Sequence, residues 1–196
     1  MKQKKLVFIM GRSSSGKNTF AEILLEDKRF EELIMHTSRP KRTENEKGYK
    51  FHNTETFIKM KENGNFVETR SYNTNLGIWH YGTTKEDIFN ALNKGKIPVI
   101  TSGTPEMYFN IKSSLENLDI EILVCYLKVE DKELLTRAIN REQCRLNPDY
   151  KEVCRRFLSD SVDYAEEITM KFPPNSTYTS TNTKENVKNF LHNNNL

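Results

Sequence analysis

The chain has 196 residues, of which 36% are hydrophobic and 29% charged, with a formal net charge of +3. This length accommodates one domain with a sizeable core, and so small a charge gives no reason to expect nucleic acid as a partner. No apolar run approaches the roughly 18 residues of a membrane-spanning helix, and three cysteines without CxxC spacing indicate reduced thiols, so we expect a cytoplasmic protein without a membrane partner.

Apolar runs that alternate with helical patterns predict an α/β fold with a mainly parallel sheet covered by helices on both faces. The first run, Leu6–Met10, is entirely apolar, as in a strand buried on both faces, and a helical pattern at Phe20, Ile23 and Leu24 follows it. Further strands are predicted at 33–35, 97–100 and 120–127, with a weaker last strand from Tyr178. Helices are predicted at 84–94, 104–117, 131–145, 150–168 and 183–192.

Residues 36–82 interrupt this alternation. They are polar and contain four glycines: Gly48, Gly64, Gly77 and Gly82. Because glycines and polar residues favour turns, this segment predicts a small inserted subdomain of short strands, with one helix near 54–62. The chain has no internal repeat and no flexible linker, which favours a single domain carrying this insertion.

The first strand leads into Gly11-Arg-Ser-Ser-Ser-Gly16-Lys17-Asn18-Thr19, hereafter the phosphate loop, which contains a G-x4-G-K motif. Glycine tolerates the dihedrals of a turn that points backbone N–H groups at phosphate oxygens, and the helix behind it adds a positive dipole end. Lysine bridges the terminal phosphates in such loops. The strict pattern has Ser or Thr after the lysine, whereas this chain has Asn18 before Thr19. The strand before the motif and the helix after it favour a phosphate cradle over an ordinary turn.

Two basic segments are candidates for binding further phosphate groups. Arg39 and Arg42 are three residues apart in a loop after the second strand, where two planar guanidinium groups could clamp a phosphate monoester. Like charges on one helical row repel one another unless an anion lies against them. One predicted helix carries such a row, and a further pair follows a short loop: Arg137, Arg141 and Arg145, then Arg155 and Arg156. Taken singly, either segment could equally be a solvated charged surface.

In order and spacing, these motifs resemble the guanylate kinase family. The resemblance runs from about Leu6 to about Phe190 and rests on the phosphate loop, Thr37–Arg42 with Gly48, Phe66–Glu68, Tyr81–Thr83 and the arginine-bearing helices. It implies a P-loop fold and a kinase that transfers the γ-phosphoryl group of Mg-ATP to GMP or dGMP. It also implies a core of 1–35, 84–137 and 157–196, an acceptor-binding insertion of 36–83 and a helical lid of 138–156.

The resemblance further implies a role for each candidate site residue. The ATP phosphates would be held by Gly11, Ser13, Ser14, Ser15, Gly16, Lys17, Asn18 and Thr19, and Asn182 would lie near the adenine. The acceptor would be bound by Arg39, Arg42, Glu68, Tyr81 and Thr83, with Glu68 reading guanine. The transferring phosphoryl group would be neutralised by Lys17, Arg137, Arg141 and Arg156. Mg²⁺ would be held by ATP oxygens, by waters and by the hydroxyl of Thr19.

Several positions depart from the family pattern. Met35 stands where the family has a guanine-binding serine, and Phe51 where it has a phosphate-binding tyrosine, for which Tyr49 could substitute. Thr101-Ser102-Gly103 replaces an Asp-x-Asp pair of which one carboxylate is associated with the metal and the other touches guanine. Two alternatives therefore stay open: a ribose bisphosphate phosphokinase, which also lacks that pair, and a guanylate-kinase-like binding module without activity.

Overall fold

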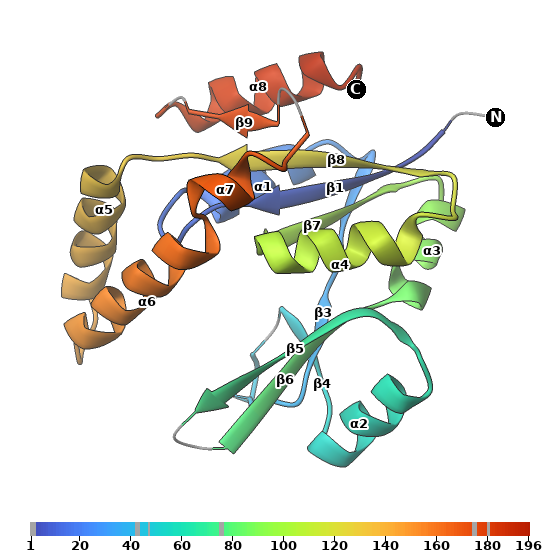
Figure 1. Ribbon diagram of the computed structural model, residues 1–196, viewed down its shortest axis with the longest axis horizontal. Helices are drawn as coiled ribbons and strands as arrows, with labels where there is room; N and C mark the ends of the chain where they lie inside the picture. The colour runs from blue at the N-terminus through green and yellow to red at the C-terminus, as the bar shows by residue number, and fades with distance from the viewer. Residues whose placement is uncertain (1–2, 42–43, 47, 75–76, 174–175, 180) are drawn as a thin grey trace.

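The computed structural model describes residues 3–41, 44–46, 48–74, 77–173, 176–179 and 181–196, and the strands of these residues form two sheets (Figure 1). The main sheet is parallel, with strand order β2-β7-β1-β8-β9. Its strands are β1 (Lys4–Met10), β2 (Phe30–Glu32), β7 (Ile97–Gly103), β8 (Ile120–Leu127) and β9 (Thr177–Tyr178). The second sheet has the order β4-β3-β6-β5 and consists of β3 (Met35–Thr37), β4 (Tyr49–Phe51), β5 (Phe66–Thr74) and β6 (Gly77–Thr84).

Helices cover both faces of the main sheet, as the sequence predicts. Their bounds are α1 (Lys17–Leu25), α2 (Thr54–Glu62), α3 (Lys85–Asn93), α4 (Pro105–Leu115), α5 (Asp131–Gln143), α6 (Tyr150–Asp163), α7 (Glu166–Thr169) and α8 (Thr183–Asn193). Along β1, Leu6, Phe8 and Met10 pack with α3 and α4, whereas Val7 and Ile9 pack with α1 and α8. All five side chains are fully buried, because successive side chains of a strand point to opposite faces. None of the helices in the described part of the chain is long and apolar enough to cross a membrane.

The prediction of one strand at 33–35 was wrong, because this run divides between the two sheets. β2 ends at Glu32 in the main sheet, although the N–H of Leu33 still donates to the carbonyl of Val99. β3 begins at Met35 and pairs with Tyr49 of β4 in the second sheet. Apolar periodicity reports that a segment is buried but not which sheet it joins.

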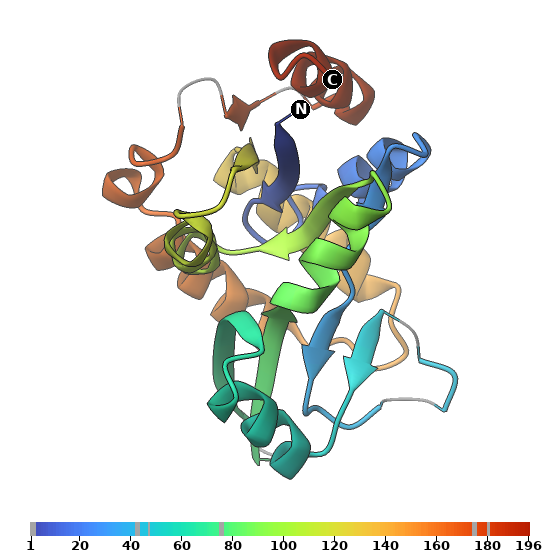
Figure 2. The ribbon, with the colours of Figure 1, turned by 90° about the vertical axis from the view of Figure 1, so that its right-hand side faces the viewer.

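The second sheet lies beneath the main sheet, with α2 beside it (Figures 1 and 2). The second sheet is tied to the core, where the Nε2 atom of His36 on β3 lies 2.8 Å from a carboxylate oxygen of Asp87 on α3. Lys50 of β4 forms an ion pair with the same carboxylate. The ring of His52 stacks on that of His36, with 4.9 Å between the ring centroids.

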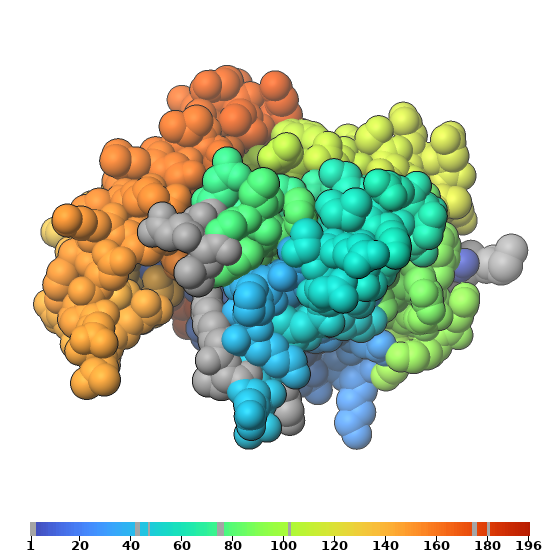
Figure 3. Space-filling view, turned by 90° about the horizontal axis from the view of Figure 1, so that it is seen from below, coloured from blue at the N-terminus to red at the C-terminus, as the bar shows by residue number. Residues whose placement is uncertain are grey.

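Helices α5 and α6 form an arm that projects beside the main sheet, hereafter the helical arm (Figure 1). The single helix predicted at 150–168 was too long, since α6 ends at Asp163 and the short α7 begins at Glu166. Tyr164 lies at the interruption as the C-cap of α6, and its side chain is buried in the core and stacks on Tyr126 with 5.6 Å between ring centroids. Seen from below, the second sheet and α2 face the viewer and the helical arm lies to one side of them (Figure 3).

Candidate active site

The phosphate loop connects the carboxyl end of β1 to the N-terminus of α1. Gly16 is the N-cap of α1 with φ 96°, and Ser14 also has a positive φ of 66°, which is uncommon for a residue other than glycine. A Cβ atom on Gly11 would lie 2.5 Å from the Oγ of Ser15 and 2.8 Å from the carbonyl oxygen of Leu127. Only glycine therefore lets the loop start this close to the end of β8. The hydroxyls of Ser14 and Ser15 are buried without a hydrogen-bond partner among the described residues, as expected of groups arranged around a ligand.

The side chain of Lys17 lies over this loop. Its Nζ donates hydrogen bonds to the carbonyl oxygens of Gly11, at 2.5 Å, and Arg12, at 3.0 Å. Burial lowers the pKa of Lys17 to about 8, the carboxylate of Asp160 opposes this shift, and Arg141 adds to it. Lys17 is thus a cation held at the mouth of an anion cradle.

A cleft of about 490 Å³ brings the loop together with the arginines that the sequence singled out. It is lined by Ser13, Ser14, Ser15, Gly16, Lys17, Asn18, Thr19, Arg137, Arg141, Arg156 and Thr183. Asn182 does not line it, but this residue is the N-cap of α8 and is adjacent to Thr183. Arginines from both helices of the arm therefore face the loop across a single opening.

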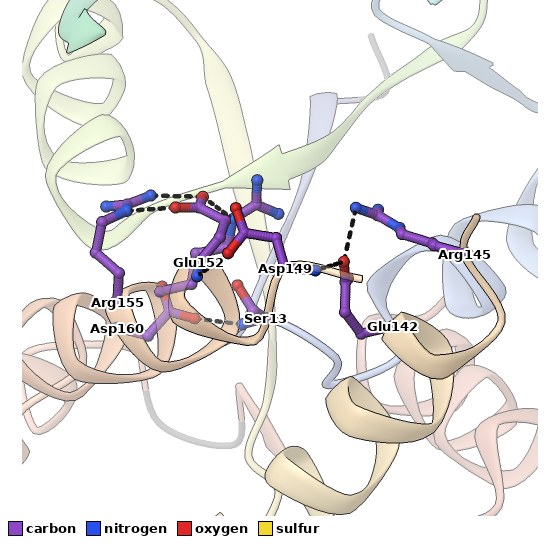
Figure 4. A network of polar contacts seen from close by, with 8 residues as sticks. Ser13, Glu142, Arg145, Asp149, Glu152, Arg155 and Asp160 are labelled. Carbon is purple, nitrogen blue, oxygen red and sulfur yellow. Dashed lines mark hydrogen bonds and ion pairs between the residues drawn. The ribbon is translucent and has the colours of Figure 1, made fainter. Parts of the chain in front are cut away.

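Two polar residues hold the helical arm against the phosphate loop, and sequence reasoning missed both. A carboxylate oxygen of Asp160 on α6 accepts a hydrogen bond from the backbone N–H of Ser13 (Figure 4). Arg12 forms an ion pair with Asp131 of α5, and its guanidinium lies 4.5 Å from the ring centroid of Phe157. A charged residue inside the phosphate loop was the signal that could have indicated Arg12.

Several of the arm's arginines are paired with carboxylates on the same helix. Glu152 accepts hydrogen bonds from Arg155 and Arg156, and the hydrogen bond from Arg155 is the largest cause that lowers the pKa of Glu152 to about 2 (Figure 4). Arg137 donates to Glu133 at 2.7 Å. These pairs are partly exposed to solvent, so each contributes little to stability.

The residues predicted to bind the acceptor lie in and beside the second sheet. Arg39 is only 3% exposed and forms an ion pair with Glu46 at 2.7 Å, which raises the pKa of its guanidinium. The rings of Tyr49 and Phe51 flank it, each with its centroid 5.4 Å from the guanidinium carbon. The ring of Tyr81 packs on Tyr49 with a centroid distance of 5.8 Å. The other predicted acceptor arginine, Arg42, lies outside the described residues.

Glu68 and Thr83 face each other across β5 and β6, since they are partners in the register of that strand pair. Glu68 is 6% exposed and Thr83 2% exposed, and one carboxylate oxygen and the threonine hydroxyl are buried without partners among the described residues. Burial raises the pKa of Glu68 to about 7, whereas Arg70 lowers it and Glu106 adds to the rise. A buried, unsatisfied carboxyl group is costly, which makes it a candidate ligand-binding group.

The structure also explains one departure from the family pattern at the end of β7. A Cβ atom on Gly103 would lie 2.2 Å from the ring atom Cε1 of Phe8, so the aromatic ring fills the place of any side chain there. The hydroxyl of Thr101 instead donates to a carboxylate oxygen of Glu32 at 3.0 Å. An adjoining cleft joins this pair to the phosphate loop, because Asn18, Glu32 and Thr101 all line it.

The residues at the cleft offer oxygen donors for a magnesium ion that is bound together with a triphosphate. Among the described residues, no group of three or more His, Cys, Asp or Glu side chains could enclose a metal. The exposed hydroxyl of Thr19 and the side chain of Asn18 supply neutral oxygen donors at the cleft, with Glu32 nearby. Oxygen donors with few carboxylates suit Mg²⁺ that keeps several waters and binds phosphate oxygens.

Tyr164 connects the loop, the end of β7 and the helical arm. Its hydroxyl accepts from the N–H of Gly11 at 3.0 Å and donates to the carbonyl oxygen of Gly103 at 3.1 Å. Burial raises the pKa of this phenol, so the hydroxyl keeps its proton at any physiological pH.

The profile of the family described as Guanylate kinase matches residues 3–153. The guanylate kinase of Mycoplasmopsis pulmonis is 25% identical over 173 residues, which cover 86% of this chain and 77% of the relative. That of Bartonella henselae is 25% identical over 143 residues, which cover 70% of this chain but only 60% of the relative, less than two thirds of its length. The crystal structure of guanylate kinase from Anaplasma phagocytophilum matches this chain with a TM-score of 0.65 at 13% identity. The match covers 100% of this chain and 87% of that one, so the two have the same fold.

Proposed function

Because this chain belongs to the guanylate kinase family, we propose that it transfers the γ-phosphoryl group of ATP to a nucleoside monophosphate, with GMP or dGMP as the acceptor. The observation that carries the proposal is the cleft in which the phosphate loop and Lys17 face Arg137, Arg141 and Arg156. The phosphate loop and the helices α1, α5, α6 and α8 all contribute residues to this cleft, and four of these residues are cations.

The reaction needs no side-chain base, because the phosphate of a nucleoside monophosphate is already an anion at neutral pH. Catalysis then consists of positioning the two phosphates in line and neutralising the charge on the transferring group. Lys17 and the loop N–H groups would hold the β- and γ-phosphates. Arg137 and Arg156 would exchange Glu133 and Glu152 for the equatorial oxygens of the transferring group. Arg141 would bind the same oxygens, while closure of the helical arm excludes water.

Magnesium, when bound with ATP, neutralises charge on the phosphate oxygens. The hydroxyl of Thr19 would contact it, with Asn18 next to it in the same cleft. The chain's own contribution to the transfer is therefore mainly cationic, from Lys17 and the arginines of the arm.

Guanine recognition is proposed for the buried carboxyl group of Glu68. Guanine presents N1–H and the 2-amino group as donors on one edge, and an ionised carboxylate can accept both. Adenine has an acceptor at N1, so it would leave the buried carboxylate facing a lone pair. Mispairing of this kind rejects a ligand strongly, because hydrogen bonds to a charged group contribute roughly 1.5–3 kcal/mol each. Met35 and Gly103 supply no side-chain hydrogen bonds, so we expect less discrimination than in relatives with the full set.

Two alternatives make different use of the same cleft. A ribose bisphosphate phosphokinase would account for the missing acidic pair, but it gives no role to the buried carboxyl group of Glu68. A binding module without activity would have no need of an intact phosphate loop, whereas Lys17 and the loop dihedrals are in place here.

A coupled assay of ADP release over a panel of acceptors tests the proposal. We expect GMP and dGMP to have the highest kcat/KM, IMP to be a fair substrate, and AMP, UMP and CMP to be poor ones. Glu68→Gln should flatten this ranking, and omitting the acceptor gives the background of ATP hydrolysis. Preference for ribose 1,5-bisphosphate over every nucleotide would establish the first alternative, and no transfer to any acceptor would establish the second.

A further inference from the structure

Arg70 lies beside the two residues to which acceptor binding is assigned above. It follows Glu68 by two positions on β5, so both side chains project from the same face of the strand. Its partner in the strand register is Tyr81 on β6. The charge of Arg70 lowers the pKa of Glu68, in the direction expected of a nearby cation.

The guanidinium of Arg70 is half-buried among weak acceptors. Nη1 lies 3.5 Å from the sulfur of Met107, and Nη2 lies 3.6 Å from the sulfur of Met35. Nε is buried and has no hydrogen-bond partner among the described residues. A guanidinium has five N–H donors, and a thioether sulfur is only a weak acceptor. One donor of the group is therefore buried and unpaired, and the other two nitrogens meet weak acceptors, as in a site that can take up an anionic or carbonyl-bearing ligand.

The position of Arg70 also compensates for a departure from the family pattern. Met35 stands where the resemblance places a guanine-binding serine, and the guanidinium of Arg70 lies directly against its sulfur. Glu68 and Arg70 together present two carboxylate oxygens next to a planar fork of N–H donors. Guanine has the matching arrangement, with donors at N1 and the 2-amino group and acceptors at O6 and N7.

We propose that Arg70 is a second base-reading residue, which donates to O6 and N7 of guanine while Glu68 accepts from N1–H and the 2-amino group. This inference rests on the proposed function and deepens it. Arginine pairs with O6 and N7 of guanine in bidentate fashion wherever geometry allows, and adenine cannot replace guanine there because it carries an amino group at position 6. A second phosphate group in this place would lie against the carboxyl group of Glu68, which disfavours a bisphosphate.

The test compares GMP with 7-deaza-GMP, in which a C–H group replaces the N7 acceptor. In the wild type we expect kcat/KM for GMP to exceed that for 7-deaza-GMP by roughly tenfold or more, the loss of one charged hydrogen bond. In Arg70→Met the ratio should fall to about one by the same reasoning. Arg29→Met is the matched control, since Arg29 forms an exposed ion pair with Asp27 and its loss should leave the ratio as in the wild type.

Because the ratio is measured within one preparation, a partly unfolded variant does not distort it. Calorimetric binding of the two nucleotides to wild type, Arg70→Met and Arg70→Lys provides the same comparison without turnover. An equal preference for GMP in wild type and Arg70→Met overturns the inference, as does a wild type that binds both nucleotides alike. A wild type that phosphorylates neither nucleotide but accepts another substrate sinks the proposed function instead, so the two failures are distinguishable.

Discussion

The carboxylate of Asp160 accepts a hydrogen bond from the backbone N–H of Ser13, and thereby takes up one of the phosphate loop's donors. The same carboxylate opposes the effect of burial on the pKa of Lys17. In this conformation the carboxylate of Asp160 thus acts on the loop as an internal anion. We expect a bound phosphate to compete with it for the same N–H group.

Removing the negative charge of Asp160 should strengthen the binding of ATP. We expect Asp160→Asn to lower the Kd for ATP severalfold, because the amide keeps a hydrogen-bond acceptor but no longer repels phosphate, a difference of roughly 1 kcal/mol near a protein surface. Titration with a fluorescent ATP analogue measures it, with the exposed Asp119→Asn as the control. Weaker binding in Asp160→Asn would mean that this carboxylate supports the loop instead of competing with its ligand.

Removal of the loop cation should abolish most of the activity. We expect Lys17→Met to keep the fold but to reduce phosphoryl transfer at least about a hundredfold, the scale of losing a major electrostatic stabiliser. Lys188→Met, an exposed position on α8, is the control. Near-normal turnover in a folded Lys17→Met protein would eliminate the assignment of the ATP site.

Substitutions of Arg39, beside the second sheet, and of Arg141, in the helical arm, should differ in their kinetic effects. We expect Arg39→Ala to raise KM for the acceptor about tenfold or more without changing the affinity for ATP, because a charged hydrogen bond to the acceptor phosphate is lost. Arg141→Ala should instead lower kcat, since its charge is needed most in the transition state. Steady-state kinetics with each substrate varied separates the two, and equal weakening of ATP binding by both variants would contradict this division.

Glu68 should make stability depend on pH. Its folded-state pKa of about 7 lies above its ordinary value of 4.5, so the native state holds the proton more tightly than the unfolded chain. Proton binding by Glu68 therefore adds to the free energy of unfolding. This contribution is present in full below pH 4.5 and is lost as the pH rises through 7, by on the order of 3 kcal/mol for a shift of this size.

Urea denaturation of wild type and Glu68→Gln at pH 5 and pH 8 measures this dependence. The glutamine variant should gain stability relative to the wild type at pH 8, and the difference should close at pH 5. A constant difference between the two proteins would show that Glu68 titrates normally in the folded state.

Introducing the family's aspartate at Gly103, at the end of β7, should destabilise the protein without restoring selectivity for guanine. Gly103→Asp would drive a side chain into the ring of Phe8, and overpacking of this kind costs about 1–3 kcal/mol or more. We therefore expect a lower melting temperature and no gain in selectivity for GMP over IMP. The double variant Phe8→Val/Gly103→Asp should recover part of the lost stability, and no recovery would mean that Phe8 is not the obstacle.

Local patterns were sufficient to predict much of this molecule. The all-apolar run at Leu6–Met10, the phosphate loop and the helix after it form one continuous stretch, so their arrangement follows from neighbouring residues. The row of Arg137 and Arg141 depends on helical periodicity, which also is local. The resemblance to a known family then indicated which loops would meet, and the cleft contains the ATP-side residues except Asn182 and Gly11.

Contacts between distant segments could not be predicted in the same way. The pair of Asp160 with Ser13 spans 147 positions, and the contact of Arg70 with Met35 spans 35, so no periodicity connects them. From the sequence alone, Arg70 would be taken for an ordinary exposed charge on a polar strand. Assignments of individual residues to ATP or acceptor binding stay predictions until ligands are bound.

The hydrogen bonds of Tyr164 hold one end of the helical arm beside the phosphate loop. This residue follows α6 immediately and is fixed between Gly11 and Gly103, while the chain enters α5 directly after the buried end of β8. Both ends of the arm are thus anchored beside the phosphate loop, whereas Leu146 at its tip is 95% exposed. We predict that the arm pivots at these two anchors, so that a small rotation there moves its tip through a larger distance. On that prediction, a crosslink between the tip and the second sheet would slow phosphoryl transfer without changing any residue that lines the cleft.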